Sequence, residues 1–224
     1  MTGSRGMAEL IAGTPVIPVL VIERADDALG IAEALVSGGL KVLEVTLRTT
    51  EALKAVSAIR HSVPEAIVGV GSVIEPEQFS QAADAGARFA VSPGATDALH
   101  AAALRANLPW LPGAQTVSDA LELRARGYRI AKFFPAHYSG GVNFLRAIAG
   151  PVPDMRFCPT GGISAASAPE YLALPNVACV GGSWLTPEAL VAERRWDEIQ
   201  SLARQAVTLA PRRSNGKARA ALNA

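Results

Sequence analysis

Short apolar segments alternate with amphipathic stretches along most of the chain. The apolar segments cover residues 16–22, 42–46, 67–71, 89–92, 110–113, 130–134, 156–160 and 177–181. Segments of this length without polar alternation are typical of strands that are buried on both faces. Alanine, leucine and paired charges with helical spacing occupy residues 26–37, 51–60, 77–85, 97–106, 118–126, 142–149 and 196–209. The pattern therefore predicts strands that alternate with helices.

The spacing of the apolar segments predicts how these strands are arranged. Their C-terminal ends recur every 21 to 26 residues, which leaves room for a strand, a short loop and a crossover helix. Eight such units favour an α/β fold of one closed (β/α)8 TIM barrel. A doubly wound open sheet is the alternative, although it would normally have fewer strands at this length.

One barrel domain accounts for most of the 224 residues. We expect an N-terminal segment or short helix over residues 1–13, the barrel over residues 14–210 and a flexible C-terminal tail over residues 211–224. Residue types that cap helices predict their boundaries. Helices are expected to begin at Asp26, at Thr49 or Thr50, at Ser118 and at Ser164, and to end at Gly38 with Gly39, at Gly86 and at Gly127.

Composition narrows the range of partners and compartments. A net charge of +1 gives no electrostatic basis for binding nucleic acid or an acidic membrane surface. No apolar stretch approaches the roughly 18 residues needed to span a bilayer, and no secretory signal is apparent. Cys158 and Cys179 lie in apolar segments and are expected to be buried free thiols, although a disulfide would be possible between neighbouring strands. We therefore expect a soluble cytoplasmic protein.

Lys132 is the charged residue whose position most needs an explanation. It lies inside the apolar segment 130–134, unlike Lys41, Lys54 and Lys217. Desolvating an ammonium group is costly, so burial favours the neutral amine of a lysine. A neutral amine is a nucleophile that can form a Schiff base with a carbonyl substrate. A buried ion pair with a carboxylate explains this residue type equally well.

The other candidate residues also lie near strand ends, which converge on one mouth in a barrel. Glu44 lies within the second apolar segment, and Arg48 follows two positions after it. Glu44, Thr46 and Arg48 share a face if that strand stays regular. Phe134 lies on the same face as Lys132. The spacing of His61, His100 and His137 is not that of a metal site, so no metal or other cofactor is expected.

The seventh and eighth strand ends carry glycine pairs followed by hydroxyl residues. These are Gly161 with Gly162, and Gly181 with Gly182 before Ser183. Glycine lets the backbone approach a ligand closely, and phosphate sites often follow strands seven and eight of such barrels. Glycine pairs also serve ordinary turns, but two pairs at the two predicted ends favour a phosphate site.

Six segments together carry a family resemblance: GLKVLEVTLRT (39–49), EAIVG (65–69), SPG (92–94), KFFPA (132–136), RFCPTGGIS (156–164) and GGSWL (181–185). From about Pro15 to Ala206 the chain resembles the 2-keto-3-deoxy-6-phosphogluconate (KDPG) aldolases. The resemblance implies a metal-independent class I aldolase, usually a homotrimer, that splits this phosphorylated keto acid into pyruvate and glyceraldehyde 3-phosphate. Some members also cleave 4-hydroxy-2-oxoglutarate (KHG) to pyruvate and glyoxylate.

The resemblance also implies roles for individual residues. Lys132 would form the Schiff base, and Glu44 would transfer protons. The remaining matched residues would bind the substrate: Arg48 and Ser72 its carboxylate, Pro93, Phe134 and Thr160 as pocket wall, and Gly161, Gly162 and Ser183 its phosphate. The chain departs from the family pattern at Ser72, where threonine is usual, and at His137, where glutamate is expected.

Two other classes of function remain open. A phosphate-binding barrel isomerase or epimerase would share the glycine pairs but would need no nucleophilic lysine. A catalytically silent binding protein would retain the fold alone. In either case Glu44 and Lys132 would be a plain buried ion pair, and Arg48 a charge at the rim.

Overall fold

The computed structural model describes residues 3–209. Within them, nine parallel strands form two hydrogen-bonded sheets, in the orders β5-β4-β3-β2-β1-β9 and β6-β7-β8. The strands are β1 (Val16–Leu20), β2 (Val42–Thr46), β3 (Ile67–Gly71), β4 (Ala90–Val91), β5 (Trp110–Leu111), β6 (Gly113–Ala114), β7 (Ile130–Phe133), β8 (Arg156–Pro159) and β9 (Val180–Gly182).

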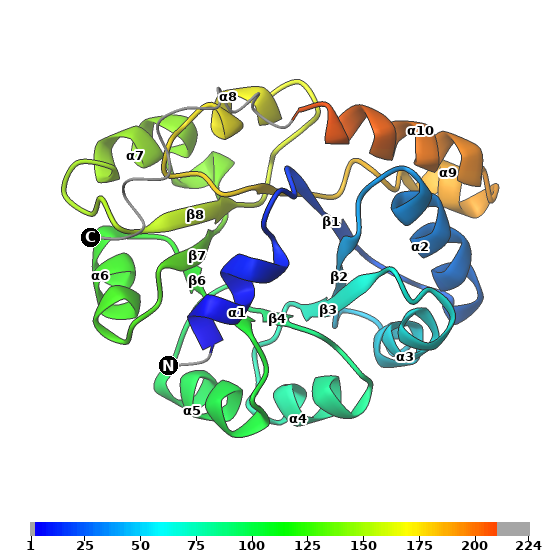
Figure 1. Ribbon diagram of the computed structural model, residues 1–224, viewed down its shortest axis with the longest axis horizontal. Helices are drawn as coiled ribbons and strands as arrows, with labels where there is room; N and C mark the ends of the chain where they lie inside the picture. The colour runs from blue at the N-terminus through cyan, green and yellow to red at the C-terminus, as the bar shows by residue number, and fades with distance from the viewer. Residues whose placement is uncertain (1–2, 210–224) are drawn as a thin grey trace.

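The two sheets are parts of one closed barrel (Figure 1). β5 and β6 are one strand interrupted at Pro112, which has no N–H to donate but accepts a 2.8 Å bond from the Lys132 N–H. At the other junction, parallel bridges join Phe157 to Val177 and Thr160 to Gly181. The predicted (β/α)8 barrel is thus confirmed. The fifth predicted strand is split in two, and the regular part of the eighth begins only at Val180.

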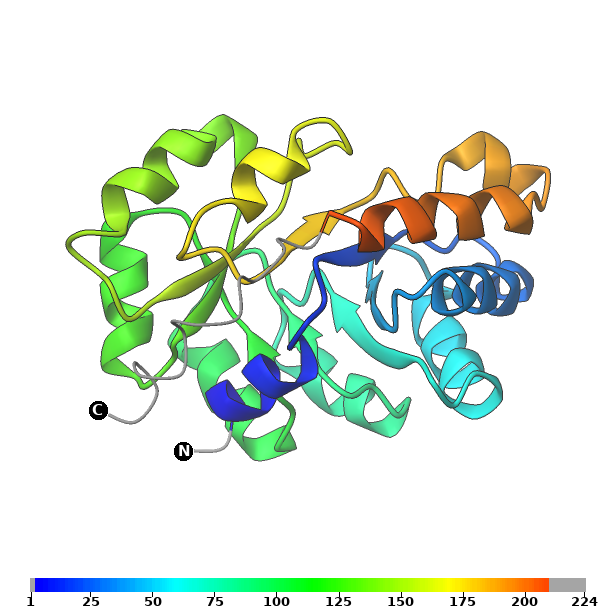
Figure 2. The ribbon, with the colours of Figure 1, turned by 45° about the horizontal axis from the view of Figure 1, so that its top comes forward.

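Helices surround the ring of strands in Figures 1 and 2. They are α2 (Ala28–Ser37), α3 (Ala52–Ser62), α4 (Glu77–Asp84), α5 (Asp97–Ala106), α6 (Val117–Ala125), α7 (Gly141–Ile148), α8 (Ala168–Leu172), α9 (Glu188–Ala192) and α10 (Trp196–Val207), while α1 (Gly3–Leu10) lies across one end of the ring. All seven predicted helical stretches are present with boundaries close to those expected. The short helices α8 and α9 have too few residues to show a helical period.

The expected helix ends are confirmed, because Gly39, Gly86 and Gly127 adopt positive φ angles directly after helices. Three of the expected N-caps are wrong by one or two residues, because the caps are Asp27 before α2, Glu51 before α3 and Thr116 before α6. Ser164 caps the turn that leads into α8, since its hydroxyl accepts from the Ser167 N–H over 3.3 Å, although Ser167 directly precedes the helix. Asp26 lies inside a short 3-10 helix, and the Thr49 hydroxyl donates to the Ile22 carbonyl instead of capping. Sequence alone leaves such boundaries uncertain by one or two residues.

Buried apolar side chains form two clusters. The larger cluster lies between the strands and the outer helices and includes Leu35, Phe79 and Trp110. The smaller one fills the barrel interior and includes Met7 and Ile11 together with side chains from several strands: Ile17, Val42, Phe89, Val91, Leu111, Ile130, Cys158 and Cys179. Helix α1 therefore closes the end of the barrel where the strands begin, and Figure 1 shows it across the ring. The opposite, C-terminal end is left for a site.

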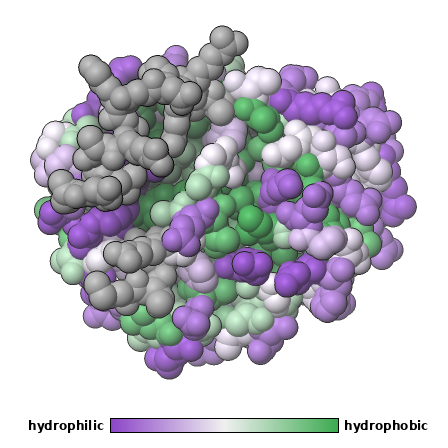
Figure 3. All heavy atoms as spheres, in the orientation of Figure 1, coloured by the Kyte–Doolittle hydropathy of each residue, from purple (hydrophilic) through white to green (hydrophobic). Residues whose placement is uncertain are grey.

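The visible part of the face in Figure 3 has hydrophilic residues around its rim and hydrophobic residues toward its middle. Among residues 3–209, no helix combines the length and hydropathy needed to cross a membrane. The expected tail, residues 211–224, lies outside the described residues, and the boundaries of the segments 1–13 and 14–210 stay predictions.

Candidate active site

Lys132 and Glu44 meet inside the barrel. Lys132 lies on β7, Glu44 lies on β2, and their side chains are 7% and 3% exposed. The Lys132 Nζ donates to Glu44 Oε1 over 3.2 Å. A pair this deeply buried and this close can exchange a proton, which makes one amine and one carboxyl group available to a bound molecule.

Two glycines on β3 provide the space for Glu44. A Cβ at Gly71 would overlap the Glu44 carboxylate, and a Cβ at Gly69 would meet the ring of Phe89 at 2.6 Å. Because both residues lack a side chain, β3 presents only backbone to the barrel interior, and the side chains of Phe89 and Glu44 occupy the space. Sequence reasoning assigned Gly71 no role, although glycines alternating along one strand face are a signal that could have found it.

The barrel interior beneath the ion pair is uncharged. Cys158 is the register partner of Lys132 on β8, and both Cys158 and Cys179 are buried free thiols, as predicted. A hydrogen bond with Cys158, together with burial, raises the pKa of the Cys179 thiol. Below the ion pair the barrel is therefore filled by apolar side chains and these two thiols, and the open side of the pair is the C-terminal end of the barrel.

Arg48 lies at the mouth, beyond the regular part of β2. The strand ends at Thr46, whose hydroxyl donates to the Leu20 carbonyl over 3.0 Å. Arg48 Nε donates to Ser72 Oγ over 3.0 Å, and Ser72 has a φ of 58°, a conformation uncommon outside glycine. The expected shared face of Glu44, Thr46 and Arg48 is therefore not continued to Arg48, because the chain turns after Thr46. The Arg48–Ser72 contact presents a guanidinium and a hydroxyl together.

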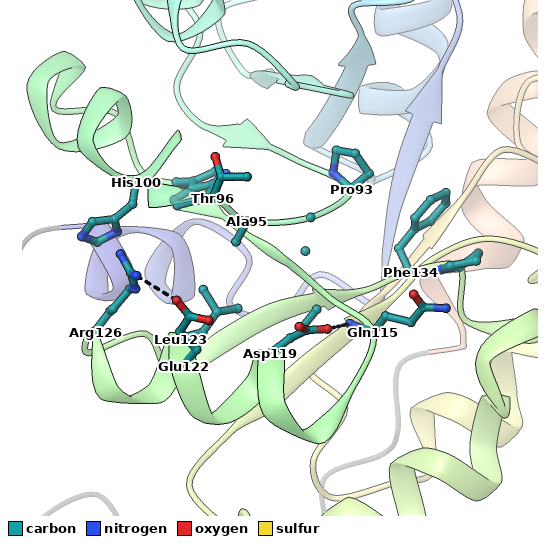
Figure 4. Close-up of a pocket in the computed structure, with 15 residues that line it drawn as sticks. Pro93, Ala95, Thr96, His100, Gln115, Asp119, Glu122, Leu123, Arg126 and Phe134 are labelled. Carbon is teal, nitrogen blue, oxygen red and sulfur yellow. Dashed lines mark hydrogen bonds and ion pairs between the residues drawn. The ribbon is translucent and has the colours of Figure 1, made fainter. Parts of the chain in front are cut away.

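Phe134 lies between the ion pair and a neighbouring cavity. Its ring centroid is 5.4 Å from the Lys132 Nζ, as expected for side chains two positions apart on one strand face. The cavity has a volume of about 470 Å³, and its lining includes Phe134 and Pro93 but neither Lys132 nor Glu44. Figure 4 shows Pro93 and Phe134 toward one end of the cavity and His100 and Arg126 toward the other. Pro93 and Phe134 thus form a boundary of the mouth.

The seventh and eighth strand ends lie side by side. Thr160 pairs with Gly181, where a Cβ would overlap the Thr160 hydroxyl. Gly161 and Gly162 follow with φ angles of 97° and 73°, which glycine adopts without strain. Exposed Ser183 follows β9 at the neighbouring strand end. The predicted phosphate residues are therefore distributed over two adjacent strand ends.

His137 packs against the first of these glycine loops. The backbone N–H of His137 donates to the Gly161 carbonyl over 3.1 Å, and a Cβ at Gly162 would meet the His137 Cβ at 2.5 Å. Among residues 3–209, no cluster of three or more histidine, cysteine or acidic side chains is arranged to hold a metal ion. At the C-terminal end of the barrel, the described residues place a buried amine and a carboxylate near an arginine and a glycine loop.

Comparison with known proteins gives a consistent result. Residues 7–202 match a family model described as KDPG and KHG aldolase. The chain is 50% identical over 201 residues to the KHG/KDPG aldolase of Escherichia coli K12, covering 89% of this chain and 94% of that protein. It is 48% identical over 199 residues to the 2-dehydro-3-deoxy-phosphogluconate aldolase of Dickeya dadantii, covering 89% and 93%.

Solved structures agree in fold and sequence. The KDPG aldolase of Legionella pneumophila, with pyruvate captured as a covalent carbinolamine intermediate, matches with a TM-score of 0.86 and 47% identity over 89% of this chain and 97% of that one. The KDPG aldolase of Zymomonas mobilis ZM4 with 3-phosphoglycerate has a TM-score of 0.87 and 44% identity, over 93% and 98%. The predicted resemblance is therefore confirmed, and this chain belongs to the KDPG and KHG aldolase family.

Proposed function

We propose that this chain is a class I aldolase that cleaves 2-keto-3-deoxy-6-phosphogluconate to pyruvate and glyceraldehyde 3-phosphate. The observation that supports it most directly is the buried Lys132–Glu44 pair, 3.2 Å apart at the C-terminal end of the barrel. The chain is about half identical to aldolases named for this reaction. A relative was captured with pyruvate as a carbinolamine, the species that loses water to give a Schiff base.

The reaction begins with addition of the Lys132 amine to the C2 ketone of the substrate. Proton transfer to Glu44 across their contact frees the lone pair on nitrogen. The amine adds to C2, and the ketone oxygen takes up one proton from the nitrogen and the proton held by Glu44. Loss of this oxygen as water leaves an iminium ion, and Glu44 is a carboxylate again. This cation can accept the electron pair of the bond between C3 and C4.

Glu44 serves the second half of the reaction. As a carboxylate it removes the proton from the C4 hydroxyl, the C3–C4 bond breaks, and the aldehyde leaves. The electron pair moves into the iminium and gives an enamine of pyruvate. Glu44 then returns the proton to C3, and water adds to the regenerated iminium to release pyruvate and restore Lys132. One carboxylate can serve both steps because the proton that it takes from the C4 hydroxyl is the proton that it returns to C3.

The remaining candidate residues bind the two ends of the substrate. Arg48 and Ser72 hold the pyruvate carboxylate, for which a planar guanidinium is well suited. Pro93, Phe134 and Thr160 form the wall beside the reacting carbons. The backbone of Gly161 and Gly162, with the Ser183 hydroxyl, binds the phosphate. In support, the Zymomonas mobilis relative was solved with the three-carbon phosphate 3-phosphoglycerate.

A second activity, cleavage of 4-hydroxy-2-oxoglutarate to pyruvate and glyoxylate, also belongs to this proposal. The Escherichia coli relative is named for both substrates. The two substrates share the 2-keto acid that Lys132 and Arg48 would engage, and they differ in the group that reaches the glycine loop. We also propose a homotrimer located in the cytoplasm, on the resemblance to the family. Light scattering of the purified protein tests the trimer.

Trapping with pyruvate tests the reaction class. The protein is incubated with pyruvate and borohydride, digested, and analysed by mass spectrometry. We expect a reduced pyruvate adduct on Lys132, with Lys132→Arg as the control that gives none. A barrel isomerase or a silent binding protein would give no adduct at Lys132. An adduct on another lysine would contradict the assignment of the nucleophile.

A further inference from the structure

The peptide that joins Pro93 to Gly94 follows β4 and lies inside the barrel mouth, against Gly113 on the strand next to Lys132. Gly113 of β6 is the register partner of Lys132. A Cβ at Gly113 would overlap the Pro93 carbonyl and would reach the Gly94 nitrogen at 2.5 Å. The Pro93–Gly94 peptide therefore occupies the space that a side chain at position 113 would fill, and it forms part of the wall beside the amine.

The side chain of Ser92 holds the next peptide along the chain, which joins Gly94 to Ala95. Ser92 is completely buried, and its Oγ donates to the Gly94 carbonyl over 2.5 Å. The same Oγ accepts a 3.0 Å bond from the indole Nε1 of Trp110. Since both hydrogen-bonding roles of the hydroxyl are used, its orientation is fixed, and so is that of the Gly94 carbonyl.

The anchor of this arrangement is rigid. Trp110 is completely buried and meets Phe79 and Tyr128 edge to face, with ring centroids 5.7 and 5.6 Å apart. The ladder of the sheet reaches Ser92, whose backbone N–H donates to the Leu111 carbonyl over 3.3 Å. It cannot continue to Pro93, which has no N–H. Gly94 is exposed. The Ser92 hydroxyl thus connects the aromatic side chains that pack around Trp110 outside the barrel to the wall inside it.

We propose that Ser92 is a positioning residue for the aldolase. Through the Gly94 carbonyl, it fixes the end of the Pro93–Gly94 segment, which forms a wall against the pyruvate portion of the substrate. Ser92 acts from behind the wall and touches no reacting atom. A wall that is already ordered lowers the entropy cost of holding the C2 carbonyl near the Lys132 amine. This inference rests on the proposed aldolase function.

Ser92→Ala tests the proposal, because it removes both hydrogen bonds and adds no bulk. We expect the KM for KDPG to rise about tenfold, equivalent to about 1.4 kcal/mol of binding, while kcat changes less than threefold. The pyruvate concentration that gives half-maximal borohydride trapping should rise in parallel. Trp110→Phe removes the indole donor but leaves the bond from Ser92 to Gly94, so its KM should rise less than that of Ser92→Ala even if its melting temperature falls. An equal or larger rise would show that the bond to Gly94 is not what positions the wall.

Asn176→Ala is the matched control for loss of a buried polar contact. Asn176 is buried, and its amide donates to the Leu145 carbonyl over 2.8 Å, ahead of β9 and away from the mouth. This variant should melt earlier with an unchanged KM. If Ser92→Ala behaves in the same way, Ser92 supports only the fold, and the proposal is overturned.

Ser92→Cys covers the case in which Ser92→Ala does not fold, because a thiol is a weaker donor at the same position. A rise in KM of at least threefold with little change in kcat supports the proposal, and an unchanged KM overturns it. Failure of the proposed function would look different. The parent protein would then neither cleave KDPG nor form a pyruvate adduct, whatever residue stands at position 92.

Discussion

The amine of Lys132 lies 3.2 Å from the carboxylate of Glu44, although 88 positions separate the two residues in sequence. Both side chains are almost completely buried. Desolvating two charges generally offsets most of their attraction, so a buried pair is a poor source of stability. The pair is better explained by chemistry, since a carboxylate beside an amine can take and return the protons that a Schiff-base reaction moves.

Replacing Lys132 should abolish turnover. Lys132→Arg keeps the positive charge opposite Glu44 but cannot supply a free amine, because guanidinium stays protonated. We expect kcat to fall at least a hundredfold, or about 2.7 kcal/mol, in a protein whose circular dichroism is unchanged. Steady-state kinetics on KDPG provide the measurement. A variant that keeps more than about a hundredth of the parent kcat would rule out Lys132 as the nucleophile.

Glu44→Gln should separate proton transfer from binding. Glutamine preserves the shape of the side chain but cannot carry the proton, so we expect kcat to fall by about 10²- to 10⁴-fold with a much smaller change in KM. Borohydride trapping with pyruvate should slow without disappearing. Glu51→Gln is the control, because Glu51 pairs with Lys54 outside the barrel. A normal kcat for Glu44→Gln would mean that another group or water handles the proton.

Gly71→Ala tests whether Glu44 needs the space that the missing side chain of Gly71 leaves on β3. The added Cβ would overlap the carboxylate, which must then swing away from Lys132 or force the strands apart. We expect kcat to fall at least tenfold. Gly150→Ala is a matched control, since a Cβ there meets nothing within 4 Å, and it should leave kcat unchanged. Equal activity in the two variants would show that the placement of Glu44 is not critical.

Asp27 offers a test of stability against pH. Its buried carboxylate pairs with Arg24 and Arg194, and the hydrogen bond from Arg24 lowers the pKa of Asp27. A carboxyl whose pKa is lower in the folded state stabilises the fold above its unfolded pKa, about 3.9 for aspartate, and loses this effect as the pH falls further. Asp27→Asn should therefore melt earlier than the parent at pH 7. The difference should shrink below pH 4, and a constant difference would contradict the ion-pair explanation.

Much of the fold could be predicted because barrel strands are apolar throughout and regularly spaced. The alternation of side chains also placed Phe134 beside Lys132 correctly. It failed for Arg48, because the regular strand ends at Thr46 and the next residues turn. No sequence pattern could show that the Ser92 hydroxyl meets Trp110 and Gly94, since that contact depends on how Trp110 packs between the strands and the outer helices. Local periodicity thus predicts strands and their faces, whereas contacts between a loop and side chains packed outside the barrel can be seen only in the three-dimensional structure.

The phosphate end can be tested at Ser183, which lies exposed after β9. Ser183→Asp adds a negative charge and replaces a donor with an acceptor, so a phosphate bound there should be repelled. We expect kcat/KM for KDPG to fall at least tenfold, or about 1.4 kcal/mol. Condensation of pyruvate with an uncharged aldehyde should be unaffected, because that acceptor carries no phosphate. The comparison of phosphorylated and neutral aldehydes in one variant is decisive. Equal losses on both would mean that Ser183 supports the fold and does not recognise phosphate.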